Sequence, residues 1–258
     1  MYLEKLRLYG RVAVVTGAGQ GIGAACARAL GEAGATLVVA DMLVERVETS
    51  VGELKALGIK AFGVVLDVVK SADVDRVAAE IEMAHGPVSI LVNNAGIARS
   101  DVKAEDTSDA HWRVHMDVNL DAVFWCCRSF GKQMLAQGKG SIVNIGSISG
   151  FIVNKPQPQA YYNASKAAVH HLTKSLAAEW AMRGVRVNAV APSYIETPLT
   201  AFGMKEQPEM YAVWREMTPM GRVGQPEEIA SVVHFLATDA ASFMTGSVVL
   251  VDGGYCSW

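Results

Sequence analysis

Short apolar runs rich in β-branched residues alternate along this chain with longer segments of helical periodicity, and this alternation strongly constrains the fold. The runs lie at residues 12–16, 36–40, 61–66, 89–93, 141–145, 186–190 and 247–251. Between them, apolar residues recur at three- and four-residue steps, in residues 22–33, 44–57, 72–85, 110–136, 161–183 and 226–237. Strands that are apolar on both faces and separated by helices form a parallel sheet. The sequence therefore predicts an α/β fold with seven parallel strands flanked by helices, doubly wound, in one domain spanning residues 1–258.

The charge balance and the cysteines exclude several classes of protein. Lys and Arg number 23 and Asp and Glu number 26, so a basic surface for nucleic acid or anionic membrane is not expected. No apolar run reaches the roughly 18 residues of a membrane span, and Met1–Gly10 lacks the apolar core of a signal peptide. The cysteines show no paired spacing: Cys26, Cys126, Cys127 and Cys256. We expect a cytoplasmic protein without disulfides or a bound metal.

A glycine-rich turn, Thr16–Gly23, directly follows the first apolar run and opens the first helical segment. Glycines let the backbone turn tightly and approach a pyrophosphate, while the helix N-terminus offers unpaired N–H groups to the anion. Tight packing of strand against helix would also explain a glycine cluster. The position after the first strand favours dinucleotide binding, typical of a Rossmann-type domain. The expected contacts here are Gly17, Gln20, Gly21, Ile22 and Gly23.

Asp41 ends the second apolar run and indicates which dinucleotide is bound. A carboxylate at this strand tip can accept hydrogen bonds from both ribose hydroxyls of an adenosine and repels a 2′-phosphate. Position 42 is Met, and Gln20 stands in the glycine turn, so neither place supplies a cation for that phosphate. These residues favour NAD over NADP. Asp41 could instead cap the helix that follows it.

Further motifs make the whole chain resemble the short-chain dehydrogenase/reductase family. The glycine spacing is Gly17-x-x-x-Gly21-x-Gly23, and Asn93-Asn94-Ala95-Gly96 follows the fourth predicted strand. Asn119 lies in a later helix, Ser147 follows the fifth strand, and Tyr162-Asn163-Ala164-Ser165-Lys166 begins the next helix. Each motif could arise by chance, but their order and their positions at strand and helix ends are specific.

Tyr162 and Lys166 are also a reasonable acid–base pair on chemical grounds alone. Residues four apart share one face of a helix. A phenol titrates near 10, and lowering its pKa by about 2–3 units requires roughly 3–4 kcal/mol of selective phenolate stabilisation. An adjacent ammonium can supply much of that stabilisation. An exposed helix face would show the same spacing, but the glycine turn upstream favours the catalytic interpretation.

The resemblance implies four catalytic residues. Tyr162 would exchange a proton with the substrate oxygen, while Lys166 would lower the pKa of that tyrosine and hold the nicotinamide ribose. Ser147 would hydrogen-bond the substrate oxygen, and Asn119 would anchor a proton-relay water. Ser149 is a second candidate serine, since it lies 13 residues before Tyr162. Ser147 is preferred because it directly follows the strand and lies 28 residues after Asn119.

The resemblance also implies the remaining cofactor contacts. Asp67 and Val68 would contact the adenine. A second group, at the ends of the fourth and sixth strands, would line the adenosine ribose and orient the nicotinamide carboxamide: Asn94, Ala95, Gly96, Pro192, Ile195 and Thr197. Ser193 stands where the family usually has glycine, so the backbone there is expected to differ.

Two segments are expected to shape the substrate site. Residues 197–224 combine three prolines with four methionines, a tyrosine and a tryptophan, which predicts a short helical lid. A surface helix packed on its own small core is the alternative. The loop at residues 151–159 offers Asn154, Gln157 and Gln159, which with Ser149 could bind vicinal hydroxyls. The stretch Val153–Lys166 is similar to the loop of bacterial polyol dehydrogenases of the galactitol, mannitol and arabinitol type, although a polar surface loop without a substrate role is the alternative.

The sequence thus predicts an NAD-dependent dehydrogenase that oxidises a polyol to a ketose. Expected substrate contacts are Ser147, Ser149, Asn154, Gln159 and Tyr162. A carbonyl reductase for hydrophobic or small ketones and a non-catalytic NAD-sensing protein are the competing hypotheses. The resemblance further implies a homotetramer, with a dimer as the next choice. The histidines show no metal-binding motif and are expected at helix surfaces or interfaces: His85, His111, His115, His170, His171 and His234.

Overall fold

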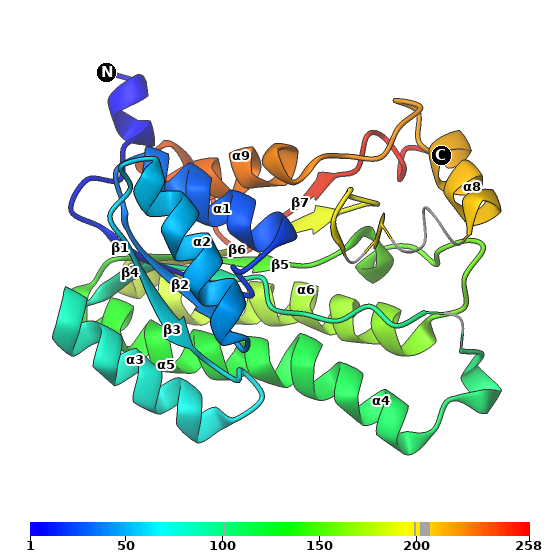
Figure 1. The fold of residues 1–258 in the computed structure, drawn as a ribbon, viewed down its shortest axis with the longest axis horizontal. Helices are drawn as coiled ribbons and strands as arrows, with labels where there is room; N and C mark the ends of the chain where they lie inside the picture. Colours follow the sequence, from blue (N-terminus) through cyan, green and yellow to red (C-terminus); the bar gives the residue numbers. More distant parts are fainter. Residues whose placement is uncertain (101, 199, 202–206) are drawn as a thin grey trace.

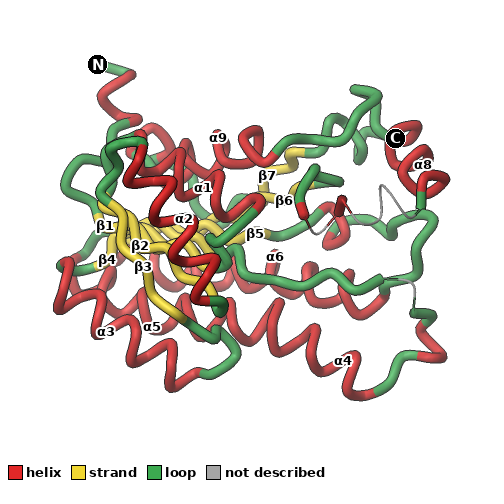
Figure 2. The backbone as a smooth tube through the Cα atoms, viewed as in Figure 1, coloured by secondary structure: helices red, strands yellow, loops and turns green. Residues whose placement is uncertain are grey.

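The strands form one parallel sheet covered by helices on both faces, in three layers (Figure 1; Figure 2). The computed structural model describes residues 1–100, 102–198, 200–201 and 207–258. The strands are β1 (Val12–Thr16), β2 (Thr36–Asp41), β3 (Ala61–Val65), β4 (Val88–Asn93), β5 (Gly140–Ile145), β6 (Val185–Pro192) and β7 (Val248–Val251). All neighbours pair in parallel. The prediction of seven parallel strands is confirmed.

The strand order places a crevice in the middle of the sheet. The order is β3-β2-β1-β4-β5-β6-β7, so the chain winds outward in one direction from β1 and in the other from β4. Loops after β1 and β4 therefore leave the sheet toward opposite faces. A doubly wound sheet binds its ligand at this reversal, beyond the carboxyl ends of the strands.

Two apolar cores hold the helices to the sheet. Helices α1 (Gly21–Glu32), α2 (Val44–Ala56) and α9 (Pro226–Ala237) pack on one face, and α3 (Ser71–His85), α5 (Ala122–Gln137) and α6 (Ala160–Trp180) pack on the other. Leu30 and Val233 lie at the centre of the first core, and Phe130 and Met134 at the centre of the second. The alternating side chains of every central strand therefore have an apolar partner on each side.

The helical segment predicted at residues 110–136 is interrupted. It consists of α4 (Asp109–Met116), a π-helical turn (Asp117–Asp121) and α5. The wider turn carries Asn119, whose side chain is buried. Helical periodicity gave no sign of this turn, because the apolar pattern continues through it. Such turns are rare and frequent at functional sites.

The segment predicted as a lid contains helix α8 (Pro208–Met217), which begins with proline at its first position. Figure 1 shows α8 beside the C-terminus, beyond the ends of β5 and β6. Residues 199 and 202–206 of this segment lie outside the described residues. Among the helices that the structure describes, none combines the length and the apolar character needed to cross a membrane.

Two glycines, which precede β5 and β6 at the amino ends of these strands, pack against each other and provide a test of the fold. Gly184 and Gly138 both have a positive φ, +79° and +66°, but a Cβ on Gly184 would lie 1.9 Å from the carbonyl oxygen of Gly138, whereas one on Gly138 would meet no atom within 4 Å. We expect Gly138→Ala to lower the free energy of unfolding by about 1 kcal/mol, the cost of a left-handed backbone. Gly184→Ala should lower it by about 3 kcal/mol, because a steric clash is added. Urea unfolding at one protein concentration measures both, and equal losses would contradict the packing.

Candidate active site

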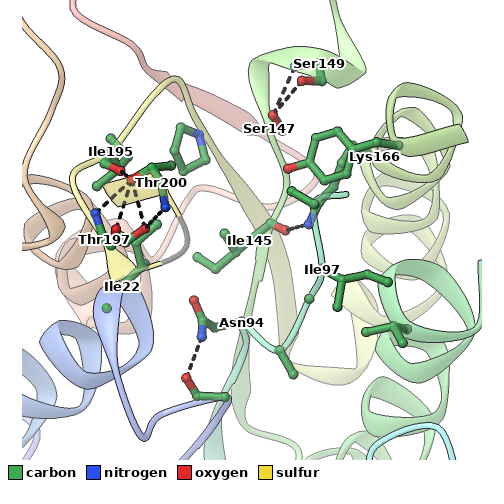
Figure 3. Close-up of a pocket in the computed structure, with 18 of the residues that line it drawn as sticks. Ile22, Asn94, Ile97, Ile145, Ser147, Ser149, Lys166, Ile195, Thr197 and Thr200 are labelled. Atoms are coloured by element: carbon green, nitrogen blue, oxygen red, sulfur yellow. Dashed lines mark hydrogen bonds between the residues drawn. The ribbon is translucent and has the colours of Figure 1, made fainter. Parts of the chain in front are cut away.

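A cavity of about 770 Å³ opens along the carboxyl ends of the strands, and it collects nearly every predicted site residue. Its lining extends from Asp41 and Asp67 at one end to Ser147, Tyr162 and Lys166 at the other. Figure 3 shows the central part, with Asn94 near Ile22 and Lys166 near Ile145. Of the predicted residues, Gly23 and Asn119 do not line the cavity. Both lie directly behind its wall.

The glycine turn has the backbone that anion binding requires. Gly17 and Gly21 have φ values of +61° and +56°, and a Cβ on Gly17 would lie 2.9 Å from the Cα of Ala95. Helix α1 begins at Gly21 without a side-chain cap, so its first N–H groups face the cavity end of the turn. Gly23 has a packing role instead, because a Cβ there would lie 2.3 Å from the Gly17 carbonyl oxygen.

Asn94 connects this turn to the centre of the sheet. Its Nδ2 donates to the carbonyl oxygens of Thr16 and Gly17, at 3.0 and 2.9 Å. Thr16 Oγ1 in turn accepts from the backbone N–H groups of Asn94 and Ala95, both at 3.1 Å. These four bonds fix the ends of β1 and β4 relative to each other. Asn94, Ala95 and Gly96 all line the cavity, where they could contact the ribose.

The carboxylate of Asp41 is held rigidly at the far end of the cavity. It is 6% exposed and accepts from the N–H groups of Gly19 at 3.1 Å and Leu43 at 3.2 Å. Leu43 is the residue before the first turn of α2, so Asp41 does not bind the N–H groups of the helix itself. Asp67 and Val68 lie nearby in the lining, as does Arg46, which the sequence reasoning missed. The residues present therefore fit the adenosine part of a nicotinamide dinucleotide.

The predicted catalytic side chains meet at the other end. Lys166 Nζ donates to the Ile145 carbonyl oxygen at 2.9 Å and lies 5.8 Å from the centre of the Tyr162 ring. Ser147 Oγ donates to Ser149 Oγ at 3.0 Å and accepts from the Ser149 N–H at 3.1 Å (Figure 3). Both serines line the cavity, so geometry alone does not remove either from contact with a substrate.

The titration of the tyrosine and the lysine is governed by burial. Burial lowers the pKa of Lys166 from 10.5 to about 8. Burial also raises the pKa of Tyr162, and a hydrogen bond with Ser147 opposes that effect. The pKa of Tyr162 is therefore raised overall in the protein chain alone, and the expected lowering by Lys166 stays a prediction. The physical reason for the raised pKa is that the ammonium is drawn to the Ile145 carbonyl while the phenol loses contact with water.

Asn119 stands behind Lys166 and fixes the loop after β4. Its Oδ1 accepts from the Ile97 N–H at 2.9 Å, and its Nδ2 donates to the Ile97 carbonyl at 3.0 Å and to Ser165 Oγ at 3.2 Å. A Cβ on Gly96 would lie 3.2 Å from Asn119 Oδ1 and 3.8 Å from Lys166 Nζ. Asn119 thus lies close to the lysine, with its amide fully engaged by the protein.

A chain of amides lines the space next to Tyr162. Gln159 Nε2 lies within hydrogen-bond distance of Ser149 Oγ, Asn154 Oδ1 and Asn163 Oδ1, at 3.3, 3.0 and 3.0 Å. Asn154 Nδ2 then donates to the hydroxyl of Tyr194 at 3.0 Å. The predicted contacts Ser149, Asn154 and Gln159 are therefore joined in one network.

Tyr194 is a member of this wall that sequence reasoning missed, and it packs on Trp214, the tryptophan of the predicted lid. The two rings stack with centres 4.0 Å apart, and the Trp214 indole N–H donates to Gln157 Oε1 at 3.3 Å. Gln157 Nε2 donates to the Tyr194 hydroxyl at 3.0 Å. Helix α8, in the predicted lid, is thereby bound to the polar loop. The sequence did carry one signal for Tyr194: it is an aromatic residue directly after β6, between the predicted contacts Pro192 and Ile195.

The backbone after β6 completes the wall. Pro192, Ile195 and Thr197 line the cavity, and Ser193 lies among them. Thr200 Oγ1 lies close to the Ile195 carbonyl and 3.2 Å from Thr197 Oγ1 (Figure 3). The segment that would orient a carboxamide is thus braced by threonine hydroxyls.

A cavity that begins at a helix N-terminus beside a buried carboxylate and ends at a phenol beside an ammonium defines a class: a nicotinamide-dependent oxidoreductase. The chain belongs to the short-chain dehydrogenase/reductase family. The family model that matches it is described as enoyl-(acyl carrier protein) reductase and covers residues 17–256.

Similar proteins of known sequence or structure cover the whole chain. Galactitol 2-dehydrogenase of Rhizobium johnstonii is 52% identical over 260 residues, which cover 100% of this chain and 99% of that protein. The crystal structure of gox2181 matches with a TM-score of 0.98 at 53% identity, covering all of both chains. A gluconate 5-dehydrogenase from Burkholderia cenocepacia, in complex with NADP and tartrate, matches with a TM-score of 0.95 at 37% identity, also over both whole chains.

The buried ammonium predicts a stability that depends on pH. Because the folded-state pKa of Lys166 is about 8, below its ordinary 10.5, the charged form costs stability at neutral pH. Without added nucleotide, Lys166→Met should raise the free energy of unfolding by about 2 kcal/mol at pH 7. The gain should shrink as the pH rises from 8 to 10.5, where the unfolded lysine also loses its proton. Urea unfolding at pH 7 and 10 measures it, with Lys174→Met, an exposed lysine on the same helix, as the control. If Lys166→Met raised the free energy of unfolding equally at both pH values, the lowered pKa of Lys166 would be contradicted.

Proposed function

We propose that the protein is an NAD-dependent polyol dehydrogenase that oxidises a secondary hydroxyl of a sugar alcohol to the ketone of a ketose. The observation that carries the proposal is the continuous amide and hydroxyl network beside Tyr162, formed by Ser149, Gln159, Asn154 and Tyr194. A substrate with several adjacent hydroxyls can exchange hydrogen bonds with such a network. The Rhizobium relative, a galactitol 2-dehydrogenase by name, supports this substrate class.

The polar wall is a better partner for a polyol than for a hydrophobic ketone. An apolar substrate would offer no hydrogen-bond partner to the buried amide groups of this wall. A site built to bind hydroxyl groups therefore rejects substrates that lack hydroxyls. Asn154 and Gln159 are both buried, and each joins at least two other polar groups of the wall. Met210 and Trp214 from the lid segment line the same cavity and would support the alternative, a carbonyl reductase for hydrophobic or small ketones.

The proposed cofactor is NAD, because of Asp41. A fixed carboxylate, bonded to two backbone N–H groups, cannot turn away from a 2′-phosphate, and the repulsion between like charges is costly. Arg46 lines the same end and would attract that phosphate, and the Burkholderia structure contains NADP. We give Asp41 the greater weight because it is buried and bonded.

In the proposed reaction, the phenolate of Tyr162 removes the proton of the substrate hydroxyl. Ser147 Oγ hydrogen-bonds the same oxygen as it becomes a carbonyl. A bound oxidised nicotinamide would supply the acceptor for the hydride of the carbinol carbon, and its positive charge would favour the phenolate. Lys166 adds a second positive charge within reach of the Tyr162 ring and of the cofactor ribose. Asn119 holds the loop after β4 beside Lys166, next to the path by which the proton would leave.

We further propose a homotetramer in the cytoplasm, with a small-molecule substrate and no nucleic-acid or membrane partner. Trp112 on α4 and Phe124 on α5 are 43% and 37% exposed. Large apolar side chains on neighbouring helices favour burial against a second copy. The cysteines are free thiols, which fits a reducing compartment. A dimer through these helices is the alternative assembly.

Initial rates with a panel of alcohols test the substrate and the cofactor together. Galactitol, sorbitol, mannitol, xylitol, arabinitol, simple 1,2-diols and one hydrophobic secondary alcohol would be offered with NAD⁺ and with NADP⁺. We expect polyol oxidation with a preference for NAD⁺ of about 100-fold in kcat/KM, because of the charge on Asp41. Turnover of the hydrophobic alcohol alone would favour the carbonyl reductase, and a preference for NADP⁺ would contradict the role of Asp41.

Tyr162→Phe separates catalysis from cofactor binding. The variant keeps the ring and loses the hydroxyl that exchanges the proton, so kcat should fall by about 1,000-fold. The dissociation constant of NADH, measured by fluorescence, should stay within about twofold. An unchanged rate would contradict the mechanism. NADH binding by a wild-type protein that turns over no alcohol or ketone would favour a sensing protein instead.

A further inference from the structure

We propose that His170 positions Ser147 for catalysis, through a neutral imidazole that accepts a hydrogen bond from the backbone of Ser147. This role rests on the proposed function of Ser147 but concerns a residue outside the predicted site. Histidines were expected at helix surfaces or interfaces, and for His115 and His170 that expectation is wrong, because both are buried.

The helix brings His170 to the site. Tyr162, Lys166 and His170 are spaced four residues apart on α6, so all three lie along one face of the helix. Lys166 binds the carbonyl of Ile145, the last residue of β5. One turn further along, His170 reaches the residues that directly follow Ile145. The same helix face therefore holds both the end of the strand and the turn after it.

The contact with that turn is specific. His170 Nε2 accepts from the backbone N–H of Ser147, with 3.5 Å between the nitrogens. The chain also curves around the ring: a Cβ on either Gly146 or Gly150 would lie 2.4 Å from an imidazole atom. Phe151 covers the outside, with ring centres 4.6 Å apart. The two glycines of the Gly-Ser-Ile-Ser-Gly segment are thus required by the imidazole.

The surroundings keep this imidazole neutral. His170 is 5% exposed, and burial together with the charges of Lys166 and Lys174 lowers its pKa to about 4. A neutral ring whose Nε2 accepts a hydrogen bond carries its proton on Nδ1. At neutral pH the acceptor is therefore permanently available to the Ser147 N–H.

Holding this N–H also orients the two hydroxyls of the site. Ser147 has an extended backbone and precedes the short 3₁₀ turn Ile148–Gly150, and its Oγ accepts from the Ser149 N–H. The same Oγ donates to Ser149 Oγ, which lies 3.3 Å from Gln159 Nε2. A shift of the Ser147 backbone would therefore move the catalytic hydroxyl and the start of the polar network together.

Three variants test the positioning role. In His170→Gln the side-chain amide can place an acceptor near the position of Nε2, whereas His170→Leu fills space without one. His171→Gln is the matched control, since His171 is the next residue and is exposed. We expect kcat of His170→Leu to fall by about 100-fold because the reacting groups are misplaced. Its KM for NAD⁺ and its Kd for NADH should remain at wild-type values. His170→Gln should recover kcat to within about threefold, since one acceptor replaces another.

A second measurement does not depend on turnover. Hydrogen–deuterium exchange of the peptide spanning residues 146–151 should be faster in His170→Leu and near wild type in both Gln variants. Wild-type kcat and exchange in His170→Leu would overturn the proposal. Equal losses in His170→Leu and His170→Gln would also overturn it, because packing rather than the acceptor would then be the cause. If the wild type oxidises no alcohol at all, the proposed function fails while the exchange experiment still decides the role of His170.

Discussion

At the active site, one side-chain amide reinforces the pairing of β1 with β4 that joins the two halves of the sheet. Asn94 reaches from the end of β4 to the carbonyl groups of Thr16 and Gly17, and Thr16 returns two hydrogen bonds to the backbone after β4. Without these bonds, the carbonyl groups of Thr16 and Gly17 and the N–H groups after β4 would lack these hydrogen-bond partners at the point where the strand order reverses. Since the glycine turn, the first N–H groups of α1 and the cavity floor all start from this junction, the cofactor end of the site depends on it.

Helix α6 organises the opposite end in a comparable way. Its face carries the phenol, the ammonium and the imidazole at successive turns, and the ammonium and the imidazole bind backbone atoms at and after the end of β5. Burial of these groups shifts their titration: it lowers the pKa of Lys166 and of His170 and raises that of Tyr162. Burial therefore disfavours the charged form of each of these three groups.

Local patterns predicted a large part of this architecture. The strand and helix order followed from apolar periodicity, and the glycine turn, Asp41 and the Tyr162–Lys166 pair were found from spacing because each acts within one turn or one helix. Contacts between segments far apart in the chain could not be predicted from periodicity or from spacing. The π-helical turn at Asn119 is hidden by a continuous apolar pattern, and the stacking of Tyr194 on Trp214 joins the segment after β6 to the lid. The direction of the Tyr162 pKa also depended on burial, which a motif does not contain.

The sequence by itself determined the fold class, the family and the identity of the groups that can do the chemistry. These follow from periodicity and from residues close together in the chain, where helix and strand geometry fixes their relation. Only the tertiary structure decided which groups are buried, how Ser149, Asn154 and Gln159 join Tyr194 in one wall, and that His170 faces Ser147 rather than solvent. The physical reason is that burial, and the pKa shifts and hydrogen bonds that come with it, depend on segments that meet only when the sheet and its helices have packed.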